Sequence, residues 1–140
     1  MNVGAIMSTP VVTVGPAATL RDAVDEMLAY RIGSVVVGDG GPLGILTRSD
    51  VLRAVAHDER SIDTVTVGGA MTEDVVTTSA DTSVKAALRA MEAHDVKKLP
   101  VTDGVELAGI VTLTDVGRHL PERVAETRRV VERRDDWTDD

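Results

Sequence analysis

Residues 44–51 read GILTRSDV, and residues 109–116 read GIVTLTDV. The duplication extends outward from this pair, because VGAIM at 3–7 returns as VGGAM at 67–71. The copies follow one another in the same order and at nearly constant spacing, with one residue added in the turn before residues 109–116. A repeat this long predicts two copies of one supersecondary unit, packed around a pseudo-two-fold axis. Any ligand-binding group that occurs in both copies then predicts a paired site.

Hydrophobic spacing and turn residues predict the same elements in both copies. Asp39-Gly40-Gly41-Pro42 is a strong hairpin signal, and Thr19 with Asp22 resembles a capping box at the start of a helix. The first copy is expected to contain a strand at Val11–Val14, a helix from Thr19, strands at Ser34–Gly38 and Leu43–Leu46, and a helix at Arg48–His57. The second copy is expected to contain a strand at Val75–Thr77, a helix at Ser83–His94, strands at Leu99–Thr102 and Leu107–Val111, and a helix at Thr114–Leu120.

This order of elements predicts an α/β (α+β) fold. Each repeat reads β-α-β-β-α, so we expect small mixed sheets packed on helices. The first repeat is assigned to residues 1–60 and the second to residues 61–120. Residues 121–140 are expected to form a C-terminal helical tail with a frayed acidic end.

Composition narrows the class of protein. The chain has 140 residues, of which 43% are hydrophobic, with one Trp, one Tyr and no Phe, so its core must be aliphatic. A net charge of −8 argues against nucleic-acid binding, because such a surface repels phosphodiester backbones. Cysteine is absent, which excludes disulfides and thiolate metal sites. No apolar run approaches the roughly 20 residues needed to cross a bilayer, and the N-terminus does not read as a secretory signal. We therefore expect a cytoplasmic protein that binds no membrane.

The duplicated motifs resemble those of the CBS-domain pair, also called a Bateman module. The resemblance covers about residues 1–120 and rests on Met7 and Met71 before Val-Val-Thr segments, on KLPVTD at 98–103, and on the two Gly-Ile-x-Thr-x-x-Asp segments. The first repeat departs from the family pattern, since Ser34 opens a strand that lacks the Leu-Pro pair. The resemblance implies tandem CBS repeats without an attached effector domain. It also implies a homodimer that reports ligand binding to a separate effector protein or through self-association.

The Thr-x-x-Asp segments carry the candidate chemistry. Residues 47–50 lie where a strand ends and a helix begins, and unpaired N–H groups there favour an anion. Hydroxyl groups could add donors to a phosphate, whereas a carboxylate suits the paired hydroxyls of ribose. The alternative is that these residues only cap a helix. The candidate ribose acceptors are Asp50 and Asp115, and the candidate phosphate donors are Thr47, Ser49, Thr112 and Thr114.

The resemblance supplies the remaining site residues. It places an adenine base against aliphatic side chains of both repeats, and it places Lys97 and Lys98 beside the nucleotide phosphates. An ammonium group is a suitable phosphate partner. The alternatives are that the valines only fill the core and that the lysines only mark a solvated strand end. The candidate base contacts are Val11, Val12, Ile45, Val75, Val76 and Ile110.

No catalytic machinery emerges from the sequence. His57, His94 and His119 are isolated, and neither a nucleophile triad nor a metal-ligand spacing is present. The function expected is therefore a non-catalytic sensor without a cofactor or metal, whose ligand is AMP, ADP, ATP or S-adenosylmethionine, bound in clefts between the two repeats. The alternative is a structural dimerisation module without a physiological nucleotide ligand.

Overall fold

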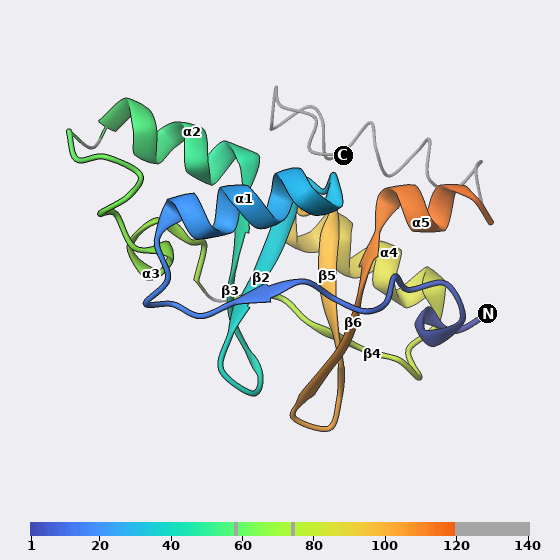
Figure 1. Cartoon of the computed structure of the whole chain (residues 1–140). Coiled ribbons are helices and arrows are strands. Elements are labelled where there is room, and N and C mark those ends of the chain that lie inside the picture. The colour runs from blue at the N-terminus through green and yellow to red at the C-terminus, as the bar shows by residue number, and fades with distance from the viewer. Residues whose placement is uncertain (58, 74, 120–140) are drawn as a thin grey trace. The chain divides into compact units, whose positions relative to one another are not determined.

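The chain forms two compact units in the computed structural model, which describes residues 1–57, 59–73 and 75–119 (Figure 1). Unit 1 comprises Met1–Val11 together with the described residues from Val76 onward, and unit 2 comprises Val12–Val75. The tail expected over residues 121–140 lies outside the described residues. Each unit is considered by itself below.

Unit 2 is a three-stranded mixed sheet with helices packed on it. The strand order is β1-β2-β3, in which β1 runs parallel to β2, and β2 and β3 form an antiparallel hairpin. The central strand is a run of buried valines, as expected for a strand covered on both faces. Its elements are β1 (Thr13–Val14), α1 (Leu20–Tyr30), β2 (Ser34–Gly38), β3 (Pro42–Thr47), α2 (Arg48–His57) and α3 (Val67–Ala70).

Unit 1 repeats this arrangement. The strand order is β4-β5-β6, again with one parallel pair and one antiparallel hairpin. Its elements are the 3₁₀ helix η1 (Val3–Ala5), β4 (Thr78–Ser79), α4 (Val84–His94), β5 (Lys98–Asp103), β6 (Glu106–Thr112) and α5 (Leu113–Gly117). The expected α/β (α+β) class with two small mixed sheets is therefore confirmed. No helix in the described part of the chain is both long enough and apolar enough to span a membrane.

Local signals in the sequence account for the ends of several elements. Thr19 and Asp22 form the expected capping box, with Asp22 N donating to Thr19 Oγ1 at 3.2 Å and Thr19 N donating to Asp22 Oδ2 at 3.1 Å. The hairpin turns use glycine where the backbone is left-handed, at Gly40 (φ 88°) and Gly104 (φ 65°). These turns fix the register of the two hairpins.

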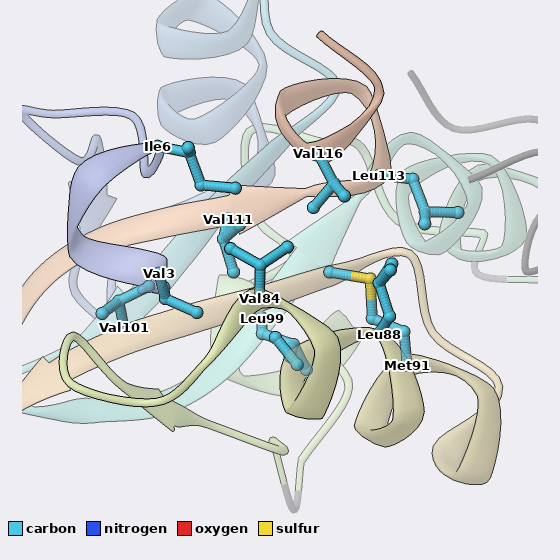
Figure 2. Packing of buried hydrophobic residues seen from close by; sticks show 11 residues of the cluster. Val3, Ile6, Val84, Leu88, Met91, Leu99, Val101, Val111, Leu113 and Val116 are labelled. Carbon is cyan, nitrogen blue, oxygen red and sulfur yellow. The ribbon is translucent and has the colours of Figure 1, made fainter. Parts of the chain in front are cut away.

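Each unit has its own aliphatic core. In unit 1, α4 contributes Val84, Leu88 and Met91, which are buried against side chains of β5, β6 and α5 (Figure 2). In unit 2, the corresponding core combines side chains from α1, α3 and the three strands. Because aromatic residues are almost absent, close packing of the cores depends on aliphatic side chains and methionine. The largest fully buried side chains are Leu20, Leu46, Met91, Leu99, Val3, Val35, Val36, Val37, Val67, Val84, Val101 and Val111.

Three elements depart most from their expected bounds, and the hairpin strands β3, β5 and β6 each extend one residue beyond the expected bounds at both ends. The strand expected at Val75–Thr77 is instead β4, at Thr78–Ser79, because the parallel pairing of Thr78 with Val101 sets its position. The strand expected at Val11–Val14 keeps only its last two residues, which pair with β2. The last helix begins one residue earlier than expected and ends at Gly117.

The opening segment of each repeat, residues 3–8 in the first and residues 67–72 in the second, belongs to the unit that contains the hairpin of the other repeat. Ser8 forms an isolated antiparallel bridge with Ile110 in unit 1, and Thr72 forms the same bridge with Ile45 in unit 2. Ser8 N donates to Ile110 O at 2.8 Å, and Thr72 N donates to Ile45 O at 2.9 Å. The ranges 1–60 and 61–120 therefore describe the duplication in sequence, whereas each compact unit contains residues of both repeats.

Glycine makes this docking possible in both units. A Cβ atom on Gly44 would lie 2.6 Å from Met71 Sδ and 2.8 Å from the Thr72 carbonyl oxygen. A Cβ atom on Gly109 would lie 2.8 Å from Met7 Sδ and 2.9 Å from the Ser8 carbonyl oxygen. Each opening segment thus fits into a notch that only a residue without a side chain leaves open.

Candidate functional site

The Asp50 position in unit 2 consists of Thr47, Asp50, Arg53 and Thr72. The carboxylate of Asp50 is only 4% exposed. Its Oδ2 accepts hydrogen bonds from Thr47 N at 2.9 Å and Thr47 Oγ1 at 3.1 Å, and Thr47 Oγ1 in turn accepts one from Asp50 N at 3.2 Å. Thr72 Oγ1 donates to Oδ1 at 3.1 Å, and Arg53 Nη2 lies 2.6 Å from the same oxygen.

The Asp115 position in unit 1 consists of Ser8, Thr112 and Asp115. The carboxylate of Asp115 is 6% exposed. Its Oδ2 accepts a hydrogen bond from Thr112 N at 2.9 Å, and its Oδ1 accepts one from Ser8 Oγ at 3.0 Å. Asp115 N donates to Thr112 Oγ1 at 3.0 Å, which completes a capping box on α5. Both carboxylates therefore cap a helix and also accept a hydroxyl group from the other sequence repeat.

Backbone hydrogen bonds hold the residue before the first strand of each hairpin beside these positions. Leu113 N donates to Lys97 O at 3.0 Å in unit 1, and Arg48 N donates to Gly33 O at 3.1 Å in unit 2. Lys98 is the cross-strand partner of Thr112, and its Nζ atom is buried. The two predicted phosphate-binding lysines thus belong to the same unit as Asp115, next to its capping threonine.

The predicted phosphate donors have unequal surroundings. The Thr47 hydroxyl donates to Asp50, so its proton is already used within unit 2. The Thr112 hydroxyl accepts from Asp115 N, and within the described residues it makes no donation of its own. Ser49 is buried, whereas Thr114 is exposed. The hydroxyl groups of unit 1 are accordingly the more accessible donors.

The predicted base contacts divide between the two units. Ile45 and Val75 belong to the unit of Asp50, and Ile110 and Val11 belong to the unit of Asp115. Val12 and Val76 do not lie in the same unit as the valine that precedes each of them. Val12 packs against the core of unit 2, and Val76 packs against the core of unit 1. All six side chains are half-buried. Their contact with a base stays a prediction.

Sequence reasoning missed three side chains that touch the two carboxylates. Ser8 and Thr72 each follow the methionine of a duplicated opening segment, so a hydroxyl at the same place in both copies was the available signal. Arg53 lies three residues after Asp50, on the same side of α2. None of them belongs to the Thr-x-x-Asp motif, which explains why the motif alone does not reveal them.

Among residues 1–57, 59–73 and 75–119, no group of three or more His, Cys, Asp or Glu side chains is arranged to hold a metal ion. The carboxylates of Asp50 and Asp115 have hydroxyl, amide and guanidinium donors around them instead. These donors are of the same kind as the hydroxyl groups that a ribose offers to a carboxylate.

A family model of the CBS domain matches residues 3–57 and 67–122. The chain belongs to the CBS domain family. The match confirms the tandem repeat, and the CBS domain pair is a regulatory module. Hypoxic response protein 1 from Mycobacterium tuberculosis is 34% identical over 119 residues, which cover 84% of this chain and 83% of that protein.

Solved structures of CBS proteins have the same fold. A CBS domain protein of Thermoplasma acidophilum, TA0289, superposes with a TM-score of 0.84 at 26% identity, covering 95% of this chain and 76% of that one. The CBS domain pair of protein MJ0100 superposes with a TM-score of 0.75 at 26% identity, covering 84% of this chain and 94% of that one. The MJ0100 structure is a complex with 5′-methylthioadenosine and S-adenosyl-L-methionine.

Proposed function

We propose that this CBS protein is a non-catalytic regulatory module that binds adenosine-containing ligands at its Asp50 and Asp115 positions. The observation that carries the proposal is the duplicated carboxylate, buried in both units and reached by a hydroxyl group from the other repeat. Capping uses one oxygen of each carboxylate. The second oxygen is available to ribose hydroxyls if the side chain that now donates to it gives way.

The ligand class follows from the groups around each carboxylate. Thr112, Thr114, Lys97 and Lys98 give unit 1 both hydroxyl and ammonium partners for a phosphate. Unit 2 has Gly33 and Ser34 where unit 1 has the two lysines. The adenosyl ligands in the MJ0100 complex support the same class for this chain. AMP, ADP, ATP and S-adenosylmethionine are therefore the ligands to test first, with phosphate-bearing ones favoured at the Asp115 position.

The proposal extends to partners and location. We expect the module to report binding to a separate effector protein, to act as a homodimer and to reside in the cytoplasm. Exposed apolar side chains on α1 and α2 support self-association, because they would be covered in a helix-to-helix dimer. These side chains are Leu28, Tyr30, Leu52 and Val55.

The second candidate is a structural dimerisation module that binds no nucleotide. The capping boxes favour it, because both carboxylates already have a structural task in the absence of a ligand. The exposed apolar side chains of α1 and α2 suit this candidate equally. The two candidates differ in one measurable property, which is the binding of adenosyl ligands.

Isothermal titration calorimetry with AMP, ADP, ATP and S-adenosylmethionine separates the candidates. We expect dissociation constants from roughly micromolar to high micromolar, or about −8 to −5.5 kcal/mol. The 2′-deoxy and 3′-deoxy forms of the best ligand serve as matched controls, and each should bind more weakly because the carboxylates lose a hydroxyl donor. Absence of heat and of a thermal shift with all four ligands would instead favour the structural module.

A further inference from the structure

The carboxylate of Asp50 has a full set of hydrogen-bond donors. A carboxylate offers about four lone-pair positions. Thr47 supplies two donors to Oδ2, while Thr72 and Arg53 supply one each to Oδ1. A ribose hydroxyl can reach Asp50 only by replacing one of these donors.

Asp115 differs from Asp50 in one charged contact. Within the described residues, its carboxylate accepts hydrogen bonds from Thr112 N and Ser8 Oγ. Arg118 stands three residues after Asp115, as Arg53 stands three residues after Asp50. In the part of the chain that the structure describes, however, Arg118 forms no ion pair with Asp115. The Asp115 carboxylate therefore keeps acceptor capacity that the Asp50 carboxylate lacks.

We propose that Arg53 is a built-in competitor for the ribose-acceptor carboxylate of unit 2. Its guanidinium is the donor that a ribose hydroxyl displaces from Asp50, so the Asp115 position fills at lower ligand concentration. This inference rests on the proposed function, because it concerns the same adenosyl ligands. It identifies Arg53 as a specificity-determining residue that sets the order in which the two positions are occupied.

The exposures of the two partners make Arg53 displaceable. The Arg53 side chain is 62% exposed, whereas the Asp50 side chain is 4% exposed. A mostly solvated guanidinium keeps its hydration when it rotates away, and ion pairs with an exposed partner are weak. Asp50 stays in place because Thr47 and Thr72 hold it. The ion pair thus lowers ligand affinity at this position without blocking it.

The test measures AMP binding by calorimetry in a background that leaves only the Asp50 position. Asp115→Ala provides that background, and Asp115→Asn provides a second one that preserves the side-chain volume at the cap. Arg53→Ala in either background should tighten AMP binding about 3- to 10-fold. Arg53→Lys should have a smaller effect, because a cation remains near Asp50. Arg118→Ala, the matched control from the other repeat, should leave the affinity unchanged.

The possible outcomes separate this inference from the proposed function. Binding by the unsubstituted protein, with affinity unchanged or weakened by Arg53→Ala, overturns the inference alone; weakening would mean that Arg53 contacts the phosphate. Equal tightening by Arg53→Ala and Arg118→Ala also overturns it, since a general charge effect would then explain both. If AMP binds neither the unsubstituted protein nor any variant, this inference is wrong and AMP is not a ligand. If none of the four adenosyl ligands binds, the proposed function is wrong as well.

Discussion

Asp50 in unit 2 and Asp115 in unit 1 occupy the same place in their repeats, yet the charged residues near them differ. Arg53 forms an ion pair with Asp50. In unit 1, Lys98 is instead the cross-strand partner of Thr112, the residue that forms a capping box with Asp115. The backbone around both carboxylates is nearly the same. In each unit the N–H group of the residue after the capping threonine, Arg48 or Leu113, donates to the carbonyl group of the residue before the first hairpin strand. The duplication therefore preserved the frame of the two positions, while their electrostatics diverged.

Gly44→Ala and Gly109→Ala test the feature in which the two units are alike. Each new Cβ would meet a methionine sulfur and a backbone carbonyl oxygen at less than 3.0 Å. The sulfur can move, but the carbonyl belongs to the bridged opening segment. Each substitution should therefore lower the free energy of unfolding by about 3 kcal/mol, as measured by urea denaturation.

Gly15→Ala is the matched control for these substitutions, because a Cβ atom there would meet nothing within 4 Å. It should change the free energy of unfolding by less than about 1 kcal/mol. A large loss at Gly44 with none at Gly109 would mean that the exchange of opening segments matters in only one unit.

Asp50→Ala and Asp115→Ala test the carboxylates themselves. Removal of a charged acceptor should weaken ligand binding at the affected position by about 1.5–3 kcal/mol, or roughly 10- to 150-fold. Calorimetry should show the larger loss for Asp115→Ala, because no guanidinium group among the described residues pairs with Asp115. Unchanged binding in the double variant would contradict the ribose-acceptor role.

The Asp→Ala variants also lose a helix cap, at a cost of about 1 kcal/mol of stability. Thermal denaturation of the ligand-free variants measures this cost. If it greatly exceeds that value while binding is unaffected, the structural role of the two carboxylates is the correct one.

Substitution of both Lys97 and Lys98 by alanine sharpens the electrostatic contrast. A charge-assisted contact to phosphate contributes about 1 kcal/mol in a partly exposed position, so ATP affinity at the Asp115 position should fall about 5-fold. Lys85→Ala, on the exposed side of α4, is the control for the loss of a positive charge. Equal weakening at both positions would show that the lysines serve both, and the proposed asymmetry would then be wrong.

The smallest effect is expected from an ion pair on the surface of unit 2. Hydrogen bonding from Arg21 lowers the pKa of Asp63 below its ordinary value, with a further contribution from Ser61. Asp63 thus stabilises the fold above the unfolded-state pKa of about 3.8, and this contribution disappears as the pH falls through the lowered pKa. Both side chains are solvated, so the effect should be close to the limit of detection.

Arg21→Gln should therefore slightly lower the melting temperature at pH 7, and the difference from the unsubstituted protein should vanish in acid. Melting curves from pH 7 to pH 2 provide the measurement. A difference that instead grows as the pH falls would contradict this assignment.

The sequence by itself determined the order of the elements and, to within a few residues, their boundaries. The strand at Ser34–Gly38 and the helix at Arg48–His57 have the bounds that the sequence predicts, and Thr19 forms its capping box with Asp22. These features depend on interactions between residues close in the chain, such as caps, turns and periodic burial. The duplication added the assignment to the CBS family, because repeated motifs in a fixed order are visible without a structure.

Only the tertiary structure decided which residues meet at each carboxylate. Ser8 reaches Asp115, and Thr72 reaches Asp50, because the opening segment of each repeat docks in a glycine notch of the other. That docking depends on contacts between residues far apart in the chain, which no local pattern encodes. The pairing of Arg53 with Asp50, and its absence between Arg118 and Asp115 in the described residues, likewise depends on side-chain conformations that identical spacing leaves open.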